Sequence, residues 1–318
     1  MKKSTIKTVY ILFATISIAF GLYGFHSGIR DIDKDNLCTA SADYCITSKD
    51  GTKLHVQEYG KGDPVILLAG GPGLNAGYLQ PVWENLSKDY RCIVLNQRGT
   101  DQSLVTVVDS ASMSMDNYVN DLEALRHHLN LKKLVLIGHS WGGMLCMVYF
   151  AKEPQHVKKV LLLDSGGPSK NFGKTFETNF NKRLTKGDLA EIKRMDSLGQ
   201  ETLKAEWPGY FYDRKRALAT QSSVPPNAHG QKDVFKFTSI NYLAGSDSMI
   251  IDLKKTTVPV FLIQGREDPR GESTAMEIKR VLPQTKIHFI EKCGHLPWLE
   301  NKEQVKDFFS SVRKALNQ

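Results

Sequence analysis

Ser140 lies in a stretch whose residue types and spacing suit nucleophilic catalysis. It is the centre of Gly138-His139-Ser140-Trp141-Gly142, a Gly-x-Ser-x-Gly sequence. Small residues on both sides of a serine let the chain turn sharply from a strand into a helix, which exposes the hydroxyl above the sheet edge. The apolar runs 133–137 and 144–151 are typical of a buried strand and a buried helix. We therefore predict that Ser140 is a nucleophile, although the bare pattern also occurs by chance in loops.

A serine hydroxyl is a weak nucleophile near neutral pH, so it needs a histidine base and a carboxylate that orients the base. Asp268 lies just past the apolar run 258–263, and His295 lies in a loop after the run 285–290. The chain order Ser140, Asp268, His295 is that of α/β-hydrolases and differs from the orders in chymotrypsin and subtilisin. We predict these three residues as the catalytic set.

Other acids and histidines remain open as alternatives. Glu267 or Asp164 could replace Asp268, since Asp164 also follows an apolar run, 160–163. The other histidines considered occupy a strand, a polar helical stretch or the variable position of the serine turn; they are His288, His127, His128 and His139. The sequence contains no His-x-x-x-His or Cys-x-x-Cys pair. We predict neither a metal nor another cofactor.

A glycine loop after the early run 64–68 is a candidate for stabilising an oxyanion. Its sequence is Ala69-Gly70-Gly71-Pro72-Gly73, in which Pro72 has no N–H to donate. The residue after the nucleophile usually supplies one backbone donor and an early loop supplies the other. We predict Trp141 and Gly71 as the two donors, although the loop on its own would indicate only a tight turn.

Four motifs give the chain a resemblance to α/β-hydrolases of the proline iminopeptidase kind. Residues 70–73 are similar to the family's His-Gly-Gly-Pro-Gly, with Ala69 in place of the histidine. Residues 96–103, Asn-Gln-Arg-Gly-Thr-Asp-Gln-Ser, resemble its Asp-Gln-Arg-Gly-x-Gly-x-Ser. The serine turn at 138–143 and the Cys-Gly-His at 293–295 complete the likeness, which covers about residues 44–318.

The resemblance implies a serine hydrolase that releases an amino-terminal residue, such as proline, from short peptides. Two alternatives from other classes remain. A carboxylic-ester hydrolase would use the same catalytic set on small esters, and a receptor or scaffold could keep the fold without activity. The partner that we expect is a small molecule or a short peptide.

The elements that must position these residues read as an α/β fold. Residues 44–47 and 53–59 flank Lys49-Asp50-Gly51 and predict an opening hairpin. Apolar strands then alternate with helices, including an amphipathic helix over 115–131 and a final helix over 302–316. We predict the α/β-hydrolase fold, a mostly parallel eight-stranded sheet flanked by helices in residues 37–318.

The alternation stops after the sixth strand, which predicts a helical cap at about 167–252. A cap can cover the sheet edge and exclude water from acyl transfer. Four aromatic residues could hold an apolar side chain or merely anchor the cap: Trp207, Tyr210, Phe211 and Tyr212. The carboxylates available for a substrate ammonium, each of which could equally be solvated, are Glu177, Glu201, Glu206 and Asp213.

The amino terminus predicts export or anchoring. Lys2, Lys3 and Lys7 precede an apolar run over 9–25, whose length lies between a secretory signal and a comfortable membrane span. We expect residues 1–36 to be a signal peptide or a membrane anchor and the enzyme to face the periplasm or the outside. A buried helix of the fold is the alternative reading.

Composition excludes some functions. The chain has 318 residues and a net charge of +8 that is spread along its length, so nucleic-acid binding is not expected. Five cysteines do not form a disulfide framework in a domain of this size, although Cys38 and Cys45 are close enough to pair after export.

Overall fold

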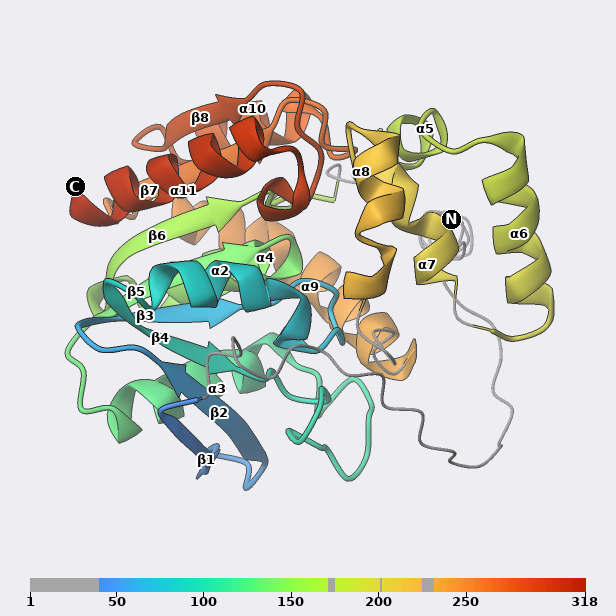
Figure 1. Cartoon of the computed structure of the whole chain (residues 1–318). Coiled ribbons are helices and arrows are strands. Elements are labelled where there is room, and N and C mark those ends of the chain that lie inside the picture. The colour runs from blue at the N-terminus through green and yellow to red at the C-terminus, as the bar shows by residue number, and fades with distance from the viewer. Residues whose placement is uncertain (1–39, 171–174, 201, 225–231) are drawn as a thin grey trace.

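The computed structural model describes residues 40–170, 175–200, 202–224 and 232–318. Their centre is one eight-stranded sheet in the order β1-β2-β4-β3-β5-β6-β7-β8 (Figure 1). β1 and β2 form an antiparallel hairpin, β2 pairs antiparallel with β4, and all later pairings are parallel. The strands are β1 (Ala42–Thr47), β2 (Lys53–Tyr59), β3 (Asp63–Leu68), β4 (Tyr90–Leu95), β5 (Leu134–His139), β6 (Val157–Leu163), β7 (Val260–Gly265) and β8 (Lys286–Ile290). This is the predicted α/β-hydrolase sheet.

Helices cover both faces of the sheet because β3 to β7 are apolar on both sides. One core contains α3 (Met115–His128), α4 (Trp141–Lys152) and α10 (Glu272–Val281). The other contains α2 (Gln80–Leu86) and α11 (Lys302–Asn317). Parallel strands buried on both faces appear in sequence as continuous apolar runs, which is why the sequence located them.

Helices replace the alternating pattern between β6 and β7, as predicted. They are α5 (Phe176–Asn181), α6 (Lys186–Ser197), α7 (Leu203–Glu206), α8 (Arg214–Ala219) and α9 (Lys232–Leu253). Figure 1 shows α5 to α8 beyond the edge of the sheet where the parallel strands end. In contrast, α9 packs on α4 and α3 and buries Val234, Tyr242 and Met249 in the core of the main domain.

Two element boundaries near the site differ from the sequence prediction. The helix predicted over 115–131 ends at His128, because Asn130 adopts a left-handed φ of 51° that stops it. The strand predicted over 133–137 continues to His139, and α4 already begins at Trp141. Ser140 is therefore the single residue between a strand and a helix.

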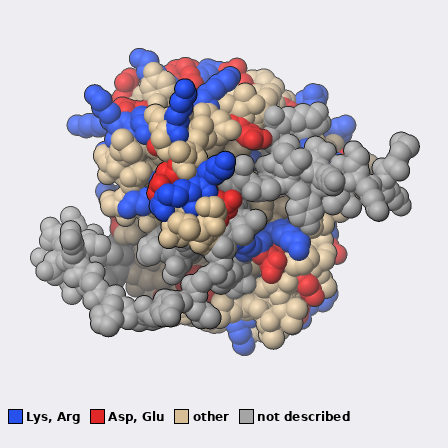
Figure 2. Space-filling model, turned by 90° about the vertical axis from the view of Figure 1, so that its right-hand side faces the viewer, with Lys and Arg blue, Asp and Glu red and all other residues tan. Residues whose placement is uncertain are grey.

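The face of the molecule that carries α5 to α8 presents both signs of charge. In Figure 2, Lys and Arg side chains lie among Asp and Glu side chains over this surface. Several of these charges pair, as in Arg214–Asp188 at 2.6 Å and Arg194–Glu191 at 2.7 Å. The Arg194–Glu191 pair is exposed, and such pairs add little stability, whereas Asp188 is half-buried.

The leader predicted at residues 1–36, with its apolar run at 9–25, lies outside the described residues. Within the part of the chain that the structure describes, no helix combines the length and hydropathy needed to cross a bilayer. Cys38 also lies outside this part, whereas Cys45 is an exposed thiol on β1 and Cys92, Cys146 and Cys293 are buried.

Candidate active site

Ser140 sits in a strained turn between β5 and α4. Its φ of 54° and ψ of −115° are unusual for a residue with a side chain, and they lift the hydroxyl above the sheet. The Ser140 N–H donates to the carbonyl of Leu163 at 2.9 Å, which ties the turn to β6. A Cβ on Gly142 would overlap the carbonyl oxygen of Leu68, so this position must stay glycine for the backbones to approach.

His295 and Asp268 meet beside this turn. β6, β7 and β8 are neighbours in the sheet, so residues that follow these strands converge at one edge. His295 Nδ1 lies 2.8 Å from Asp268 Oδ2, and both side chains are buried. Burial alone would raise the pKa of Asp268, but the charge and hydrogen bond of His295 hold it below its usual value. These surroundings favour an ionised Asp268 in hydrogen-bond contact with His295.

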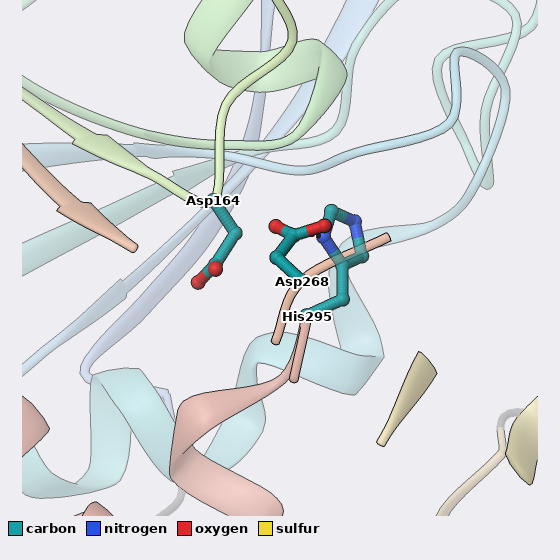
Figure 3. Close-up of side chains that lie close together, drawn as sticks. All are labelled: Asp164, Asp268 and His295. Atoms are coloured by element: carbon teal, nitrogen blue, oxygen red, sulfur yellow. Dashed lines mark hydrogen bonds and ion pairs between the residues drawn. The ribbon is translucent and has the colours of Figure 1, made fainter. Parts of the chain in front are cut away.

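Asp164, the alternative acid, is a third member of the same cluster. Figure 3 shows the Asp268 carboxyl between Asp164 and the His295 ring, and one ligand atom from each residue lies within 4.8 Å of the others. Asp164 Oδ1 accepts from the Gly265 N–H at 2.8 Å. Burial and the negative charge of Asp268 raise the pKa of Asp164 well above its usual value. Glu267, the other alternative, points to Arg183 at 3.0 Å and is 43% exposed.

His139 links the glycine loop to the His295 loop. The Gly70 N–H donates to the Tyr78 hydroxyl at 2.5 Å, and that hydroxyl lies 2.7 Å from His139 Nδ1. His139 Nε2 lies 3.0 Å from the carbonyl oxygen of His295. Burial and the nearby His295 hold the pKa of His139 well below its usual value. A neutral ring that accepts at Nδ1 and donates at Nε2 satisfies all of these partners.

Arg270 is a cation in hydrogen-bond contact with Ser140, and the sequence analysis did not identify it. Its Nη2 donates to Ser140 Oγ at 3.1 Å. Among the described residues, Ser140 Oγ makes no hydrogen bond with His295 in this arrangement. A serine oxygen has two lone pairs and one proton, so a bond from Arg270 leaves the Ser140 proton available to His295. An arginine after Asp-Pro looks in sequence like a solvated turn residue, and no pattern marks it as facing the serine.

The two predicted oxyanion donors border one pocket. Its lining consists of Gly71, Pro72, Trp141, Met144, Ser239, Tyr242, Leu243 and Arg270. Trp141 begins α4, so its N–H belongs to the first turn, whose N–H groups have no acceptor within the helix. Gly71 has a φ of 114°, which favours glycine. Gln97 holds the two parts together: it accepts from Trp141 Nε1 at 2.8 Å and donates to the carbonyl of Ala69 at 2.8 Å.

The aromatic residues predicted in the cap mostly anchor it. Trp207 and Phe211 are buried in the core that includes α11, whereas Tyr212 is 45% exposed. Tyr210 alone reaches the site: its ring stacks on His295 with 5.6 Å between centroids, and its carbonyl accepts from the His295 N–H at 2.7 Å. The cap therefore helps to hold the His295 loop.

Glu206 is the most enclosed of the cap carboxylates that the sequence suggested. It is 1% exposed, and its Oε1 accepts from the Thr202 hydroxyl at 2.6 Å. Oε2 has no hydrogen-bond partner among the described residues. Burial raises the pKa of Glu206 to about 7. Asp213 instead caps α8, Glu177 is exposed, and Glu201 lies outside the described residues.

Comparison with known proteins agrees with this architecture. Residues 63–302 match the model of the alpha/beta hydrolase fold family. The chain is 27% identical over 272 residues to a proline iminopeptidase from Heyndrickxia coagulans. This alignment covers 80% of this chain and 93% of that protein.

Two solved structures share the fold. One is an esterase from Exiguobacterium antarcticum, with a TM-score of 0.65 and 18% identity over 86% of this chain and 99% of that one. The other is a proline iminopeptidase from Mycobacterium smegmatis, with a TM-score of 0.64 and 19% identity over 87% of this chain and 98% of that one. Identities this low show the fold alone. On the strength of the family match and of the sheet described above, the chain belongs to the alpha/beta hydrolase fold family.

Proposed function

We propose that this hydrolase is a serine hydrolase that works through an acyl-enzyme. The observation that carries the proposal is the buried hydrogen bond of 2.8 Å between His295 and Asp268 at the sheet edge that also presents Ser140. His295 uses Nδ1 for this bond, which leaves Nε2 to accept a proton. The ionised Asp268 then stabilises the imidazolium that forms.

The reaction proceeds in two balanced halves. Ser140 Oγ attacks the substrate carbonyl carbon while His295 takes the hydroxyl proton, and the N–H groups of Gly71 and Trp141 stabilise the oxyanion. His295 returns the proton to the leaving nitrogen or oxygen, and the acyl group remains on Ser140. Water then attacks the ester, with His295 again as base, and releases the acid and the free serine.

The substrate class that we propose is short peptides with an amino-terminal proline or small apolar residue. Similarity to proline iminopeptidases over about four-fifths of the chain supports this class. Glu206 offers a buried carboxylate for the substrate ammonium, and its charge acts on Tyr210, whose ring stacks on His295. An amine seated there would favour the ionised form of Glu206.

A carboxylic-ester hydrolase is the second candidate, and Arg270 favours it. A guanidinium 3.1 Å from Ser140 Oγ would repel a substrate ammonium placed near the scissile bond. Simple esters carry no such charge.

Turnover of proline 4-nitroanilide and of 4-nitrophenyl acetate by the purified protein tests these proposals. Cleavage of the anilide, abolished in Ser140→Ala, supports the aminopeptidase; cleavage of the ester alone supports the esterase. A fluorophosphonate probe should label the wild type and spare Ser140→Ala. If the folded wild type is not labelled and cleaves neither substrate, the serine hydrolase proposal is wrong.

We also propose that residues 1–36 export or anchor the enzyme. The support is the sequence itself, in which Lys2, Lys3 and Lys7 precede the apolar run 9–25.

A further inference from the structure

Arg270 is a charged side chain at the candidate site that the acyl-enzyme mechanism does not use. Its Nη2 lies 3.1 Å from Ser140 Oγ, and the side chain lines the pocket that Gly71 and Trp141 border. Backbone contacts fix its place: the Arg270 N–H donates to Asp268 Oδ1 at 2.7 Å, and its carbonyl accepts from the Thr274 hydroxyl at 2.9 Å. The loop that carries Asp268 therefore also presents a cation to the nucleophile.

The surroundings of Arg270 make it receptive to an anion. Burial lowers its pKa, and the charge of Asp268 opposes this effect, but an arginine stays protonated at any physiological pH. Phe176 lies against the guanidinium at 5.4 Å from its ring centroid. In such a partly apolar pocket, a carboxylate gains more from a guanidinium than it would in water.

The geometry also limits where that anion can lie on a substrate. A carbonyl carbon poised for attack lies about 3–3.5 Å from the nucleophilic oxygen. Because Nη2 is at a similar distance from the same oxygen, it reaches only groups a few bonds away from the scissile carbonyl. The free carboxylate of a dipeptide satisfies this condition from the leaving side, and a dicarboxylic half-ester satisfies it from the acyl side.

We propose that Arg270 is a specificity-determining residue that binds a substrate carboxylate next to the scissile carbonyl, so that the site selects carboxylate-bearing peptides or esters. This inference rests on the proposed serine hydrolase. It resolves the conflict between an aminopeptidase and a nearby cation, because a dipeptide presents its ammonium and its carboxylate on opposite sides of the scissile bond.

Matched substrate pairs test the inference. Pro-Gly is compared with prolylglycinamide, and 4-nitrophenyl hemisuccinate is compared with 4-nitrophenyl butyrate, each by kcat/KM. We expect the wild type to prefer the carboxylate member of at least one pair, and the pair that shows the preference identifies the leaving side or the acyl side. In Arg270→Gln the preference should fall by about 10- to 100-fold, the range for a lost hydrogen bond to a charged group. The preference of Arg270→Lys should lie between those of the wild type and Arg270→Gln, since lysine keeps the charge and loses the planar guanidinium.

Arg266→Gln is the matched control. Arg266 lies on the same loop but pairs with Glu291 at 2.7 Å and with Glu272, away from Ser140. Its substitution should leave the preference unchanged. Labelling by a neutral fluorophosphonate shows in each variant that the site is folded. The inference is overturned if the wild type shows no preference. It is also overturned if Arg270→Gln lowers kcat/KM equally for both members of a pair, which would make Arg270 a general oxyanion or structural residue.

Calorimetry separates this inference from the proposed function. Succinate should bind the folded protein, and Arg270→Gln should abolish the heat of binding. If the wild type cleaves none of the four substrates, the proposed function fails, and calorimetry alone tests the carboxylate site. Succinate binding that is lost in Arg270→Gln supports the site. Absence of succinate binding to the wild type overturns it.

Discussion

Asp164 and Asp268 are two buried carboxyl groups whose surroundings push their pKa values apart. The charge and hydrogen bond of His295 lower the pKa of Asp268, whereas burial and the negative charge of Asp268 raise the pKa of Asp164. Two like charges this close do not both ionise readily. The two aspartates that the sequence left as alternatives therefore lie in different surroundings, which favour the protonated form of Asp164 and the ionised form of Asp268.

Substitution by asparagine should separate the two roles. Asp268→Asn should lower kcat/KM on 4-nitrophenyl acetate by about 10⁴-fold, because the amide favours the wrong histidine tautomer. Asp164→Asn should keep most of the activity, since its amide resembles a protonated carboxyl and can still accept from Gly265. If Asp164→Asn loses as much as Asp268→Asn, the assignment of Asp268 as the orienting acid is wrong.

The same pair predicts a pH effect on stability. The pKa of Asp164 is raised in the folded state, whereas in the unfolded state it is 3.8. As pH rises above 3.8, only the unfolded state releases the proton, so the free energy of unfolding falls. Asp164→Asn has no proton to release, so its stability relative to the wild type should grow as pH rises from 4 towards neutrality. Urea unfolding at several pH values measures this difference. A difference independent of pH would contradict the raised pKa.

Glu206 gives a third prediction for single residues. Its pKa of about 7 in the folded state, against 4.5 for an ordinary glutamate, means that stability falls as pH rises from 4.5 to 7 and then levels off. Glu206→Gln should therefore be more stable than the wild type at pH 8, by about 1–3 kcal/mol. If Glu206 also binds the substrate ammonium, this variant should lose proline 4-nitroanilide activity and keep ester activity. Exposed Glu177 provides the control, since Glu177→Gln should change neither property.

Sequence reasoning proposed residues by their place after strands and missed contacts between residues that are distant in sequence. Ser140, Asp268 and His295 each follow an apolar run, so strand-end placement was enough to propose them together. The contacts of Arg270 with Ser140 and of Tyr78 with His139 join residues that are distant in sequence and meet only in the folded chain. Nothing in local composition distinguishes such residues from solvated ones.

The turn from β5 to α4 is the element on which the site depends. Its glycines let α4 approach β3 closely, and a Cβ on Gly142 would overlap backbone atoms that cannot rotate away. Gly142→Ala should therefore destabilise the protein by about 1–3 kcal/mol, as overpacking does, and reduce fluorophosphonate labelling of Ser140.

Gly245 offers a matched control for this substitution. It lies inside α9, and a Cβ there would meet nothing within 4 Å. Gly245→Ala should stabilise the protein by about 0.5–1 kcal/mol, because alanine loses less backbone freedom in a helix. Thermal unfolding of both variants measures the contrast. Equal effects at the two positions would show that glycine at 142 is not required by packing.

Elements were predictable from sequence to different degrees. Buried parallel strands appear as apolar runs, and the sequence placed them to within about three residues of where they lie. Helices between β6 and β7 were predicted as a region and not one by one, because most are short and depend on contacts with the main domain. One signal was present and unused: Thr185 and Asp188 form a capping box that starts α6.

At the scale of the whole molecule, the site and the carboxyl terminus lie at opposite ends. Figure 1 shows the end of α11 far from α5 to α8, which lie beyond the edge where the parallel strands end. A reporter fused after Gln318 should therefore leave the site accessible. This arrangement allows location and activity to be measured on the same full-length protein.

The leader prediction is testable with such a fusion. The apolar run at 9–25 should carry the enzyme out of the cytoplasm, so an added protease should degrade the reporter in cells whose outer membrane, where one is present, has been opened and whose inner membrane is intact. Ile16→Arg combined with Ile18→Arg should abolish this exposure, because each arginine near the centre of an inserting helix costs about 2.5–3.5 kcal/mol. Ile16→Leu with Ile18→Leu is the matched control and should behave as the wild type. Hydrolase activity in lysates should survive all of these changes, because the sheet and the site are built from residues after 40. A reporter that stays protected in the wild type under these conditions would place the enzyme in the cytoplasm and contradict the leader prediction.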